Sequence, residues 1–169
     1  MVRVLWSRLE HGAAVYHPGS QPPGAGSRVW YGEENMYGKA AADFPRRIVC
    51  LTSEHVEICY ALGAGDRVVG VPGTAQRPPE ARDRPKVGGF TSFRRDKIIE
   101  LEPDLVLAFS DLQADIAAEL IRAGLAVLCT NQRSVDDILA AILMVGGALG
   151  LAREAGGLVQ DIRDELKQV

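Results

Sequence analysis

The sequence predicts an α/β protein, a small doubly wound parallel sheet of about four to five strands with helices on both faces. From about residue 44 onward, short apolar runs rich in β-branched residues alternate with longer segments of helical spacing. Such alternation is typical of a parallel sheet joined by right-handed crossovers. The 169 residues and the 47% hydrophobic content suffice for one domain with a sizeable core.

The first strand and helix are predicted from one continuous segment. Residues 48–51 read IVCL, an apolar run expected of a strand buried on both faces, and the strand is placed at 47–51. Thr52, Ser53 and Glu54 then supply hydroxyl caps and an acid for a helix over roughly 54–62. Gly63 and Gly65 end that helix, and a second strand follows at 67–71.

The alternation continues to the end of the chain. Two further strands are predicted at 104–108 and 126–130, and four further helices at roughly 95–101, 112–123, 134–149 and 152–168. Ser110 with Gln113, and Ser134 with Asp137, have the spacing of a capping box at two of these helix starts. The elements together make a Rossmann-like sheet that ends in a long helix with a narrow apolar stripe.

The charge balance argues against a nucleic-acid partner. The formal net charge is −3, whereas phosphate binding needs a clustered positive face. Five arginines do fall close together between residues 77 and 95, but acids interleave with them. A solvated loop is therefore favoured over a phosphate site.

No membrane span or convincing signal peptide is predicted. The longest apolar run, 138–152, is shorter than the roughly 18 residues that a span needs, and it contains three glycines. Arg8, Glu10 and His11 interrupt the apolar residues at the N-terminus. As written, the chain is expected to be cytoplasmic.

The three cysteines, Cys50, Cys59 and Cys129, are expected to be small buried hydrophobic residues. Their odd number and wide spacing argue against a disulfide framework and against a zinc site. No cofactor is implied.

Residues 1–43 differ in character from the rest and are set apart from a domain at 44–169. They contain the Pro- and Gly-rich stretch HPGSQPPGAGS, and their apolar periodicity is poor. They are either a low-order extension or upstream sequence translated from a wrong start, with Met36 as the true first residue. Trp6, Trp30 and Tyr31 could instead form a small partner-docking element.

The segment from Pro45 to Ala108 resembles a known family. It reads PRRIVCLTSEHVEICYALGAGDRVVGV and, after a loop, KVGGFTSFRRDKIIELEPDLVLA. This is similar to the N-terminal lobe of the periplasmic substrate-binding proteins of ABC importers for cobalamin and ferric siderophores. The resemblance covers residues 44–169, about half of a family member, and the last helix resembles the spine helix that joins the two lobes.

The resemblance implies capture without catalysis. The ligand would be a metal-chelate nutrient, with cobalamin or another corrinoid first and a ferric siderophore or haem next. The partner would be an ABC permease. Family members normally work outside the inner membrane, and the second lobe that closes their ligand cleft has no counterpart here.

The candidate ligand residues follow from the sheet. In open α/β sheets, ligands bind beyond the carboxyl ends of the strands, and the loops there offer aromatic, hydroxyl, amide and cationic groups. In related proteins, matching loops supply aromatic residues, often tryptophan, that pack on the ligand, and Phe90 and Phe109 fall at such positions. The candidates are Thr52, Ser53, Glu54, Thr74, Arg77, Phe90, Thr91, Phe109, Ser110, Gln132 and Arg133.

Each candidate also has a purely structural interpretation. The two phenylalanines could be core residues, and the hydroxyls of Thr52, Ser53 and Ser110 could serve only as helix caps. The two arginines could face solvent or could pair with a ligand carboxylate or phosphate.

His55 and Asp96 each have two alternative interpretations. His55 could coordinate a metal, but no second ligand lies at a useful spacing, so a surface histidine in the first turn of a helix is favoured. Asp96 resembles by position the acid that docks on a permease arginine. It could equally be an acid that interacts with the helix dipole.

Enzyme activity is not expected. No dinucleotide, P-loop or nucleophile-elbow motif is present, and although His55 and Cys59 share a helix face, Cys59 is expected to point into the core. The alternative function is a truncated lobe that acts as a cytoplasmic interaction or regulatory module. Separately, the exposed last helix could mediate self-association. A binding protein should bring Phe90, Phe109 and Gln132 together at an open pocket. An interaction module should expose an apolar patch.

Overall fold

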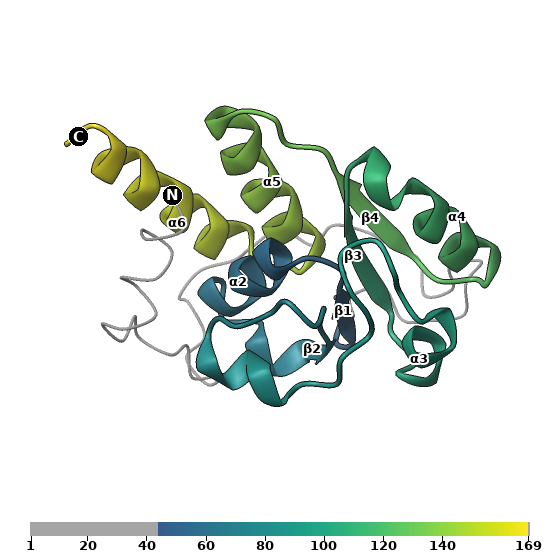
Figure 1. Cartoon of the computed structure of the whole chain (residues 1–169). Helices are drawn as coiled ribbons and strands as arrows, with labels where there is room; N and C mark the ends of the chain where they lie inside the picture. Colours follow the sequence, from purple (N-terminus) through teal and green to yellow (C-terminus); the bar gives the residue numbers. More distant parts are fainter. Residues whose placement is uncertain (1–43, 169) are drawn as a thin grey trace, which may run out of the picture.

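The computed structural model describes residues 44–168, which form a four-stranded parallel sheet flanked by helices (Figure 1). The strand order β2-β1-β3-β4 is that of a doubly wound sheet. The strands are β1 (Ile48–Cys50), β2 (Val68–Gly70), β3 (Leu105–Phe109) and β4 (Val127–Thr130). The helices are α2 (Ser53–Ala61), α3 (Arg95–Glu100), α4 (Ala114–Arg122), α5 (Val135–Ala148) and α6 (Ala152–Leu166).

The two faces of the sheet are covered by different helices because side chains alternate along each strand. Ile48 and Cys50 of β1 join a hydrophobic cluster with residues of α2, α5 and α6. Val49 of β1 and Val106 of β3 face the other way, toward Ile98 of α3 and Leu120 of α4. The predicted fold class is confirmed, and every strand and helix boundary lies within two residues of the predicted one.

Three short 3-10 helices, which the sequence pattern does not predict, connect these elements. They are η1 (Gly65–Arg67), η2 (Pro79–Asp83) and η3 (Asp111–Gln113). The last of them occupies the start of the helix predicted at 112–123, so that α4 begins only at Ala114. Short elements of this kind have no hydrophobic period that would distinguish them from a helix or a loop.

The predicted caps are present, with one difference. Thr52 caps α2 by accepting a hydrogen bond from the backbone N–H of His55, and Ser134 and Asp137 form a reciprocal capping box on α5. Ser110 accepts from the backbone N–H of Leu112, but Gln113 does not reach back to Ser110. Its side chain has another role, described below.

The prediction of three buried cysteines is correct for two of them. Cys50 and Cys59 are fully buried free thiols with their sulfur atoms 3.9 Å apart, and burial raises the pKa of Cys50 well above its usual value. Cys129 is exposed, so the prediction is wrong there. The physical reason is that β4 forms one edge of the described sheet and is only partly covered.

The close contact of α5 with α6 depends on a glycine. A Cβ atom at Gly146 would collide with the methyl group of Ala155 across the helix pair. Among residues 44–168, no helix is both long enough and apolar enough to cross a membrane. Met36, Trp6, Trp30 and Tyr31 lie outside the described residues.

Candidate functional site

The carboxyl ends of β1 and β4 are linked by the side chain of His55. Its Nδ1 lies 2.9 Å from Thr52 Oγ1, after β1, and its Nε2 lies 3.0 Å from Thr130 Oγ1, at the end of β4. His55 is fully buried, and burial lowers its pKa to about 4, so the imidazole is neutral at pH 7. The expectation of a surface histidine is therefore wrong. Its ring contacts Thr130, 75 residues away in the chain, and local sequence cannot reveal such a contact.

The environment of His55 does not favour a metal. Both ring nitrogens already have hydroxyl partners, and no lone pair is left for an ion. Within residues 44–168, no group of three His, Cys, Asp or Glu side chains could hold a metal ion. His55 instead links the N-terminus of α2 to the end of β4 at the candidate site.

Gln113 links three loops through hydrogen bonds, although its position in the sequence predicted only a capping role. Its Nε2 donates to the carbonyls of Leu51 (3.2 Å) and Phe90 (3.0 Å), and its Oε1 accepts from the backbone N–H of Phe109 (2.9 Å). The side chain is almost fully buried. The one signal in the sequence was the spacing of Ser110 and Gln113, which indicated that Gln113 bonds to nearby backbone.

The loop that carries Phe90 is tightly folded. At Gly88, φ is +146°, and a Cβ there would lie 2.5 Å from the carbonyl oxygen of Ser92 and 2.6 Å from the Cα of Phe93. Only glycine fits this close return of the chain. Gly88 and Gln113 together therefore determine where Phe90 lies.

Phe90 and Phe109 come together at this edge of the sheet. Their ring centroids are 6.4 Å apart with the planes tilted by 50°, and the Arg133 guanidinium lies 5.8 Å from the centroid of Phe109. Arg133 also pairs with Asp111, with Nη2 and Oδ1 2.8 Å apart. Phe90 is 38% exposed, so this aromatic and cationic cluster can meet a ligand without unfolding.

Gln132 lies in the loop after β4, beside Arg133. It is 8% exposed, and neither its Oε1 nor its Nε2 has a hydrogen-bond partner. Buried amides are normally paired, because an unpaired one costs free energy in the folded state. The unsatisfied donor and acceptor of Gln132 lie in the loop that also carries Arg133, and a polar ligand edge would pair with both of them.

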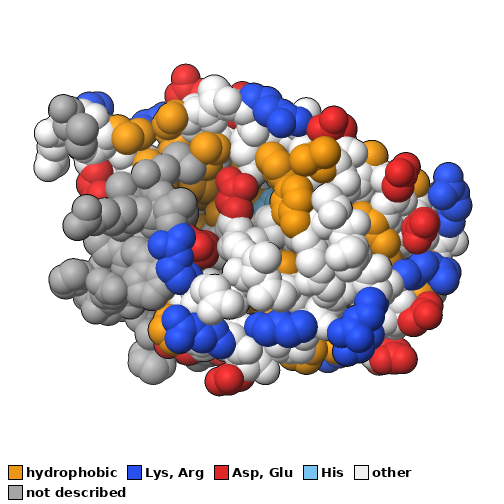
Figure 2. Space-filling model, viewed as in Figure 1, with side chains coloured by type: hydrophobic (Ala, Val, Ile, Leu, Met, Phe, Trp, Pro, Cys, Tyr) orange, Lys and Arg blue, Asp and Glu red, His pale blue; other side chains and the backbone are white. Residues whose placement is uncertain are grey.

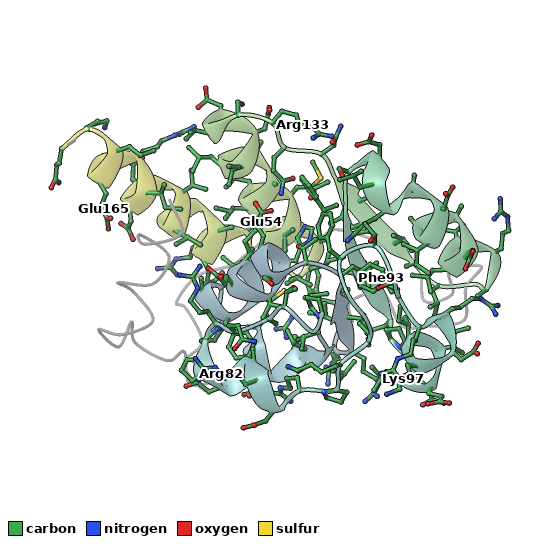
Figure 3. The ribbon with its side chains drawn as sticks, in the orientation of Figure 1. Glu54, Arg82, Phe93, Lys97, Arg133 and Glu165 are labelled. Carbon is green, nitrogen blue, oxygen red and sulfur yellow. The ribbon has the colours of Figure 1, made fainter. Side chains whose placement is uncertain are left out.

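The remaining candidates lie apart from the aromatic cluster. Ser53 and Thr74 bond to each other through their hydroxyls at 3.0 Å, which links the loops after β1 and β2. Glu54 is partly exposed at the start of α2, and Figure 3 shows it below Arg133, near the middle of the view. Figure 2 shows a hollow in this face, with an acidic side chain on one rim and apolar side chains on the opposite rim.

Three predicted residues belong neither to the aromatic cluster nor to the pair formed by Ser53 and Thr74. Arg77 turns to Glu57 of α2, with Nη2 and Oε1 3.2 Å apart. Burial raises the pKa of Glu57, and the charge and hydrogen bond of Arg77 oppose that rise. Thr91 is exposed beside Phe90. Asp96 is exposed in the first turn of α3 and lies 3.8 Å from the guanidinium of Arg95.

Residues 48–169 match the sequence model of a protein family described as "Periplasmic binding protein". An uncharacterized ABC transporter substrate-binding lipoprotein, YvrC of Bacillus subtilis, is 38% identical over 129 residues, covering 74% of this chain and 41% of the Bacillus protein.

Solved structures agree with this match. The crystal structure of the periplasmic vitamin B12-binding protein BtuF of Vibrio cholerae aligns with a TM-score of 0.68 and 26% identity, covering 73% of this chain and 49% of that one. The periplasmic heme-binding protein RhuT of Roseiflexus sp. RS-1 aligns with a TM-score of 0.68 and 30% identity, covering 73% and 48%.

The chain spans about half the length of the relatives that it matches. The matched half begins at β1 and runs through α6, and it corresponds to the segment from which the family resemblance was predicted. The family match, the strand order and the loops gathered at the carboxyl ends of the strands agree with one another. This chain belongs to the periplasmic binding protein family.

Proposed function

We propose that this chain provides one wall of the ligand site in a substrate-binding protein of an ABC importer, and that it binds a metal-chelate nutrient without catalysing a reaction. The observation that carries the proposal is the exposed ring of Phe90 against Phe109, with Arg133 over Phe109 and the unpaired buried amide of Gln132 in the same loop as Arg133. A large ligand with an apolar face and polar edges matches both features.

A corrinoid is the first candidate ligand. Its ring carries several carboxamide side chains, and a carboxamide both donates and accepts, as the orphan amide of Gln132 requires. The propionates of haem only accept, so they would satisfy one of the two atoms. Haem and ferric siderophores are the next candidates, and the relatives named for vitamin B12 and for heme support both classes.

The permease is the proposed protein partner. Asp96 offers a carboxylate whose side chain is almost fully exposed in the first turn of α3. Its contact with Arg95 is long and solvated, so Asp96 can exchange it for an arginine of a partner at little cost. The lipoprotein and periplasmic names of the relatives support a site of action outside the inner membrane.

Equilibrium dialysis of the chain against cyanocobalamin, a ferric hydroxamate siderophore and haem tests the proposal. Because one wall buries only part of a ligand, we expect weak, saturable one-to-one binding of one of them, tightest for cyanocobalamin. Phe90→Ala and Phe109→Ala should each weaken it about tenfold or more. Ile121→Ala removes an exposed apolar side chain from α4 and is the matched control.

No uptake of any of the three ligands would contradict a binding site in this chain by itself. Equal losses for Ile121→Ala and for Phe90→Ala would contradict its location at the aromatic pair. Preference for haem over cyanocobalamin would keep the binding function and reject the corrinoid assignment.

A further inference from the structure

The outer face of α5 is apolar although it faces solvent. Ala140, Leu143, Met144 and Gly147 follow one another at helical spacing, and all four are exposed. Leu143 is 42% exposed and Met144 52% exposed. Figure 2 shows apolar side chains over α5, at the upper left of this view. We call these four residues the α5 outer face.

The last helix differs from α5 in this respect. Leu166 is the large apolar residue of α6 that is clearly exposed within the described part of the chain, and charged residues surround it. The opposite side of α5 already packs in the core, through residues such as Ile142 and Val145. The α5 outer face is therefore apolar surface that remains exposed to solvent in the folded chain.

The α5 outer face is complementary to itself. Four residues at positions i, i+3, i+4 and i+7 of a helix outline a hole that receives a side chain of a facing helix. Here the two ends of the hole are small, Ala140 and Gly147, and its two sides are Leu143 and Met144. A two-fold axis near the middle of α5 places the Leu143 or Met144 of one copy in the hole of the other, with the helices antiparallel.

Charges at the two ends of α5 agree with this arrangement. Asp136 lies in the first turn of α5, and Arg153 lies in the first turn of α6, just beyond the last turn of α5. Both side chains are exposed, and neither forms an ion pair with another described residue. Antiparallel pairing brings Asp136 of one copy toward Arg153 of the other, twice, and also opposes the helix dipoles favourably.

We propose that the α5 outer face binds a second copy of this chain, forming a two-fold symmetric dimer with antiparallel α5 helices. This inference is independent of the ligand proposal, because the face lies on α5 and contains neither Phe90 nor Phe109. Self-complementarity and opposite charges at the two ends favour a second copy over an unrelated protein.

Sedimentation velocity of the full 169-residue chain tests the proposal over about a hundredfold range of concentration. We expect a reversible monomer–dimer equilibrium. Leu143→Glu and Met144→Glu should each abolish the dimer, because they bury a carboxylate without a partner. Ile121→Glu places the same charge on an exposed apolar position of α4 and should leave the dimer unchanged.

A charge exchange tests the geometry. Asp136→Arg and Arg153→Asp should each raise the dissociation constant about tenfold, because each disrupts two symmetric pairs. The double variant should recover, since both pairs are rebuilt with reversed sign. Thermal unfolding of each variant checks that the fold is retained.

A chain that stays monomeric at every concentration would overturn the proposal and leave the α5 outer face to a partner of another chemistry. A dimer that survives Leu143→Glu would also overturn it, because another surface would then hold the copies together. Failure of the double charge variant to recover would reject the antiparallel arrangement.

Discussion

Two buried glutamines lie in the loops that follow neighbouring strands, and they differ in one respect. Gln113, after β3, forms hydrogen bonds through both atoms of its amide, to Leu51, Phe90 and Phe109. Gln132, after β4, has no partner for either atom. The first amide therefore belongs to the structure of the site, and the second is open to something that the chain itself does not supply.

At this one edge of the sheet, the amide of Gln113 therefore contributes to stability, and the amide of Gln132 is available for binding. A satisfied buried amide stabilises the loops that it joins, whereas an unsatisfied one destabilises the protein until a ligand pairs with it. Substitution of the two glutamines should therefore change the free energy of unfolding in opposite directions.

The largest effect is expected for Gln113→Ala. Removal of the amide leaves the N–H of Phe109 and the carbonyl of Leu51 without their partner, which should lower the free energy of unfolding by about 3 kcal/mol. Urea unfolding followed by circular dichroism measures it. Gln160→Ala, at an exposed glutamine of α6 that bonds only to Asp164, is the control and should cost under about 0.5 kcal/mol. Similar losses for the two variants would contradict the role of Gln113.

The second effect is a pH dependence that comes from His55. Its pKa is about 4 in the folded chain and about 6.5 when unfolded, so the unfolded state takes up a proton first as the pH falls. The stabilisation is complete above pH 6.5 and is lost progressively as the pH approaches 4. Between pH 7.5 and pH 4.5, the loss should reach about 2.5 kcal/mol.

A His55→Gln variant isolates this contribution, because glutamine does not titrate. Glu57, whose pKa is raised by burial, acts with the opposite sign but is present in both proteins. The difference in free energy of unfolding between the two proteins should therefore shift by about 2.5 kcal/mol against the unsubstituted chain as the pH falls from 7.5 to 4.5, as measured by urea unfolding at several pH values. A difference that does not depend on pH would contradict the buried, neutral imidazole.

The third effect has the opposite sign. Gln132→Met replaces the unpaired amide by an apolar side chain of similar length, and it should raise the free energy of unfolding by about 1 kcal/mol. The same variant should bind the ligand of the dialysis experiment more weakly. An unchanged or lower stability would mean that the amide already has a partner, such as a water molecule.

The smallest effect is expected next to Gln132. Asp111 and Arg133 form an ion pair that is largely exposed to solvent, so Asp111→Asn should lower the free energy of unfolding by less than about 1 kcal/mol. The loss should shrink further in 0.5 M salt, at a Debye length of about 4 Å. A loss as large as that of Gln113→Ala would show that the loop after β4 is held as firmly as the loop after β3.

The fold was predictable from the sequence because apolar periodicity and helix caps are local signals. The run at 48–51 and the capping box of Ser134 and Asp137 indicate a strand and a helix start without knowledge of the rest of the chain. The structure also places the ring centroids of Phe90 and Phe109 6.4 Å apart, because the topology fixes where the strands end.

The details of the site were not predictable because they depend on contacts between distant residues. His55 bonds to Thr130, 75 residues away, and Gln113 bonds to Leu51, 62 residues away. Cys129 is exposed because its strand lies at the edge of the described sheet, and the pattern of a short apolar strand does not distinguish an edge from a centre. The ligand roles of Ser53, Thr74 and Arg133 remain predictions.

The unequal exposure of the three cysteines makes the unmodified chain suitable for site-selective labelling. Cys50 and Cys59 are sealed in the core, whereas Cys129 is reachable and its sulfur lies 3.7 Å from the carbonyl oxygen of Ser110, at the rim of the candidate site. Desolvation raises the pKa of Cys129, so a maleimide dye should couple faster at mildly alkaline pH. A single fluorophore could then report ligand arrival without any cysteine being introduced or removed.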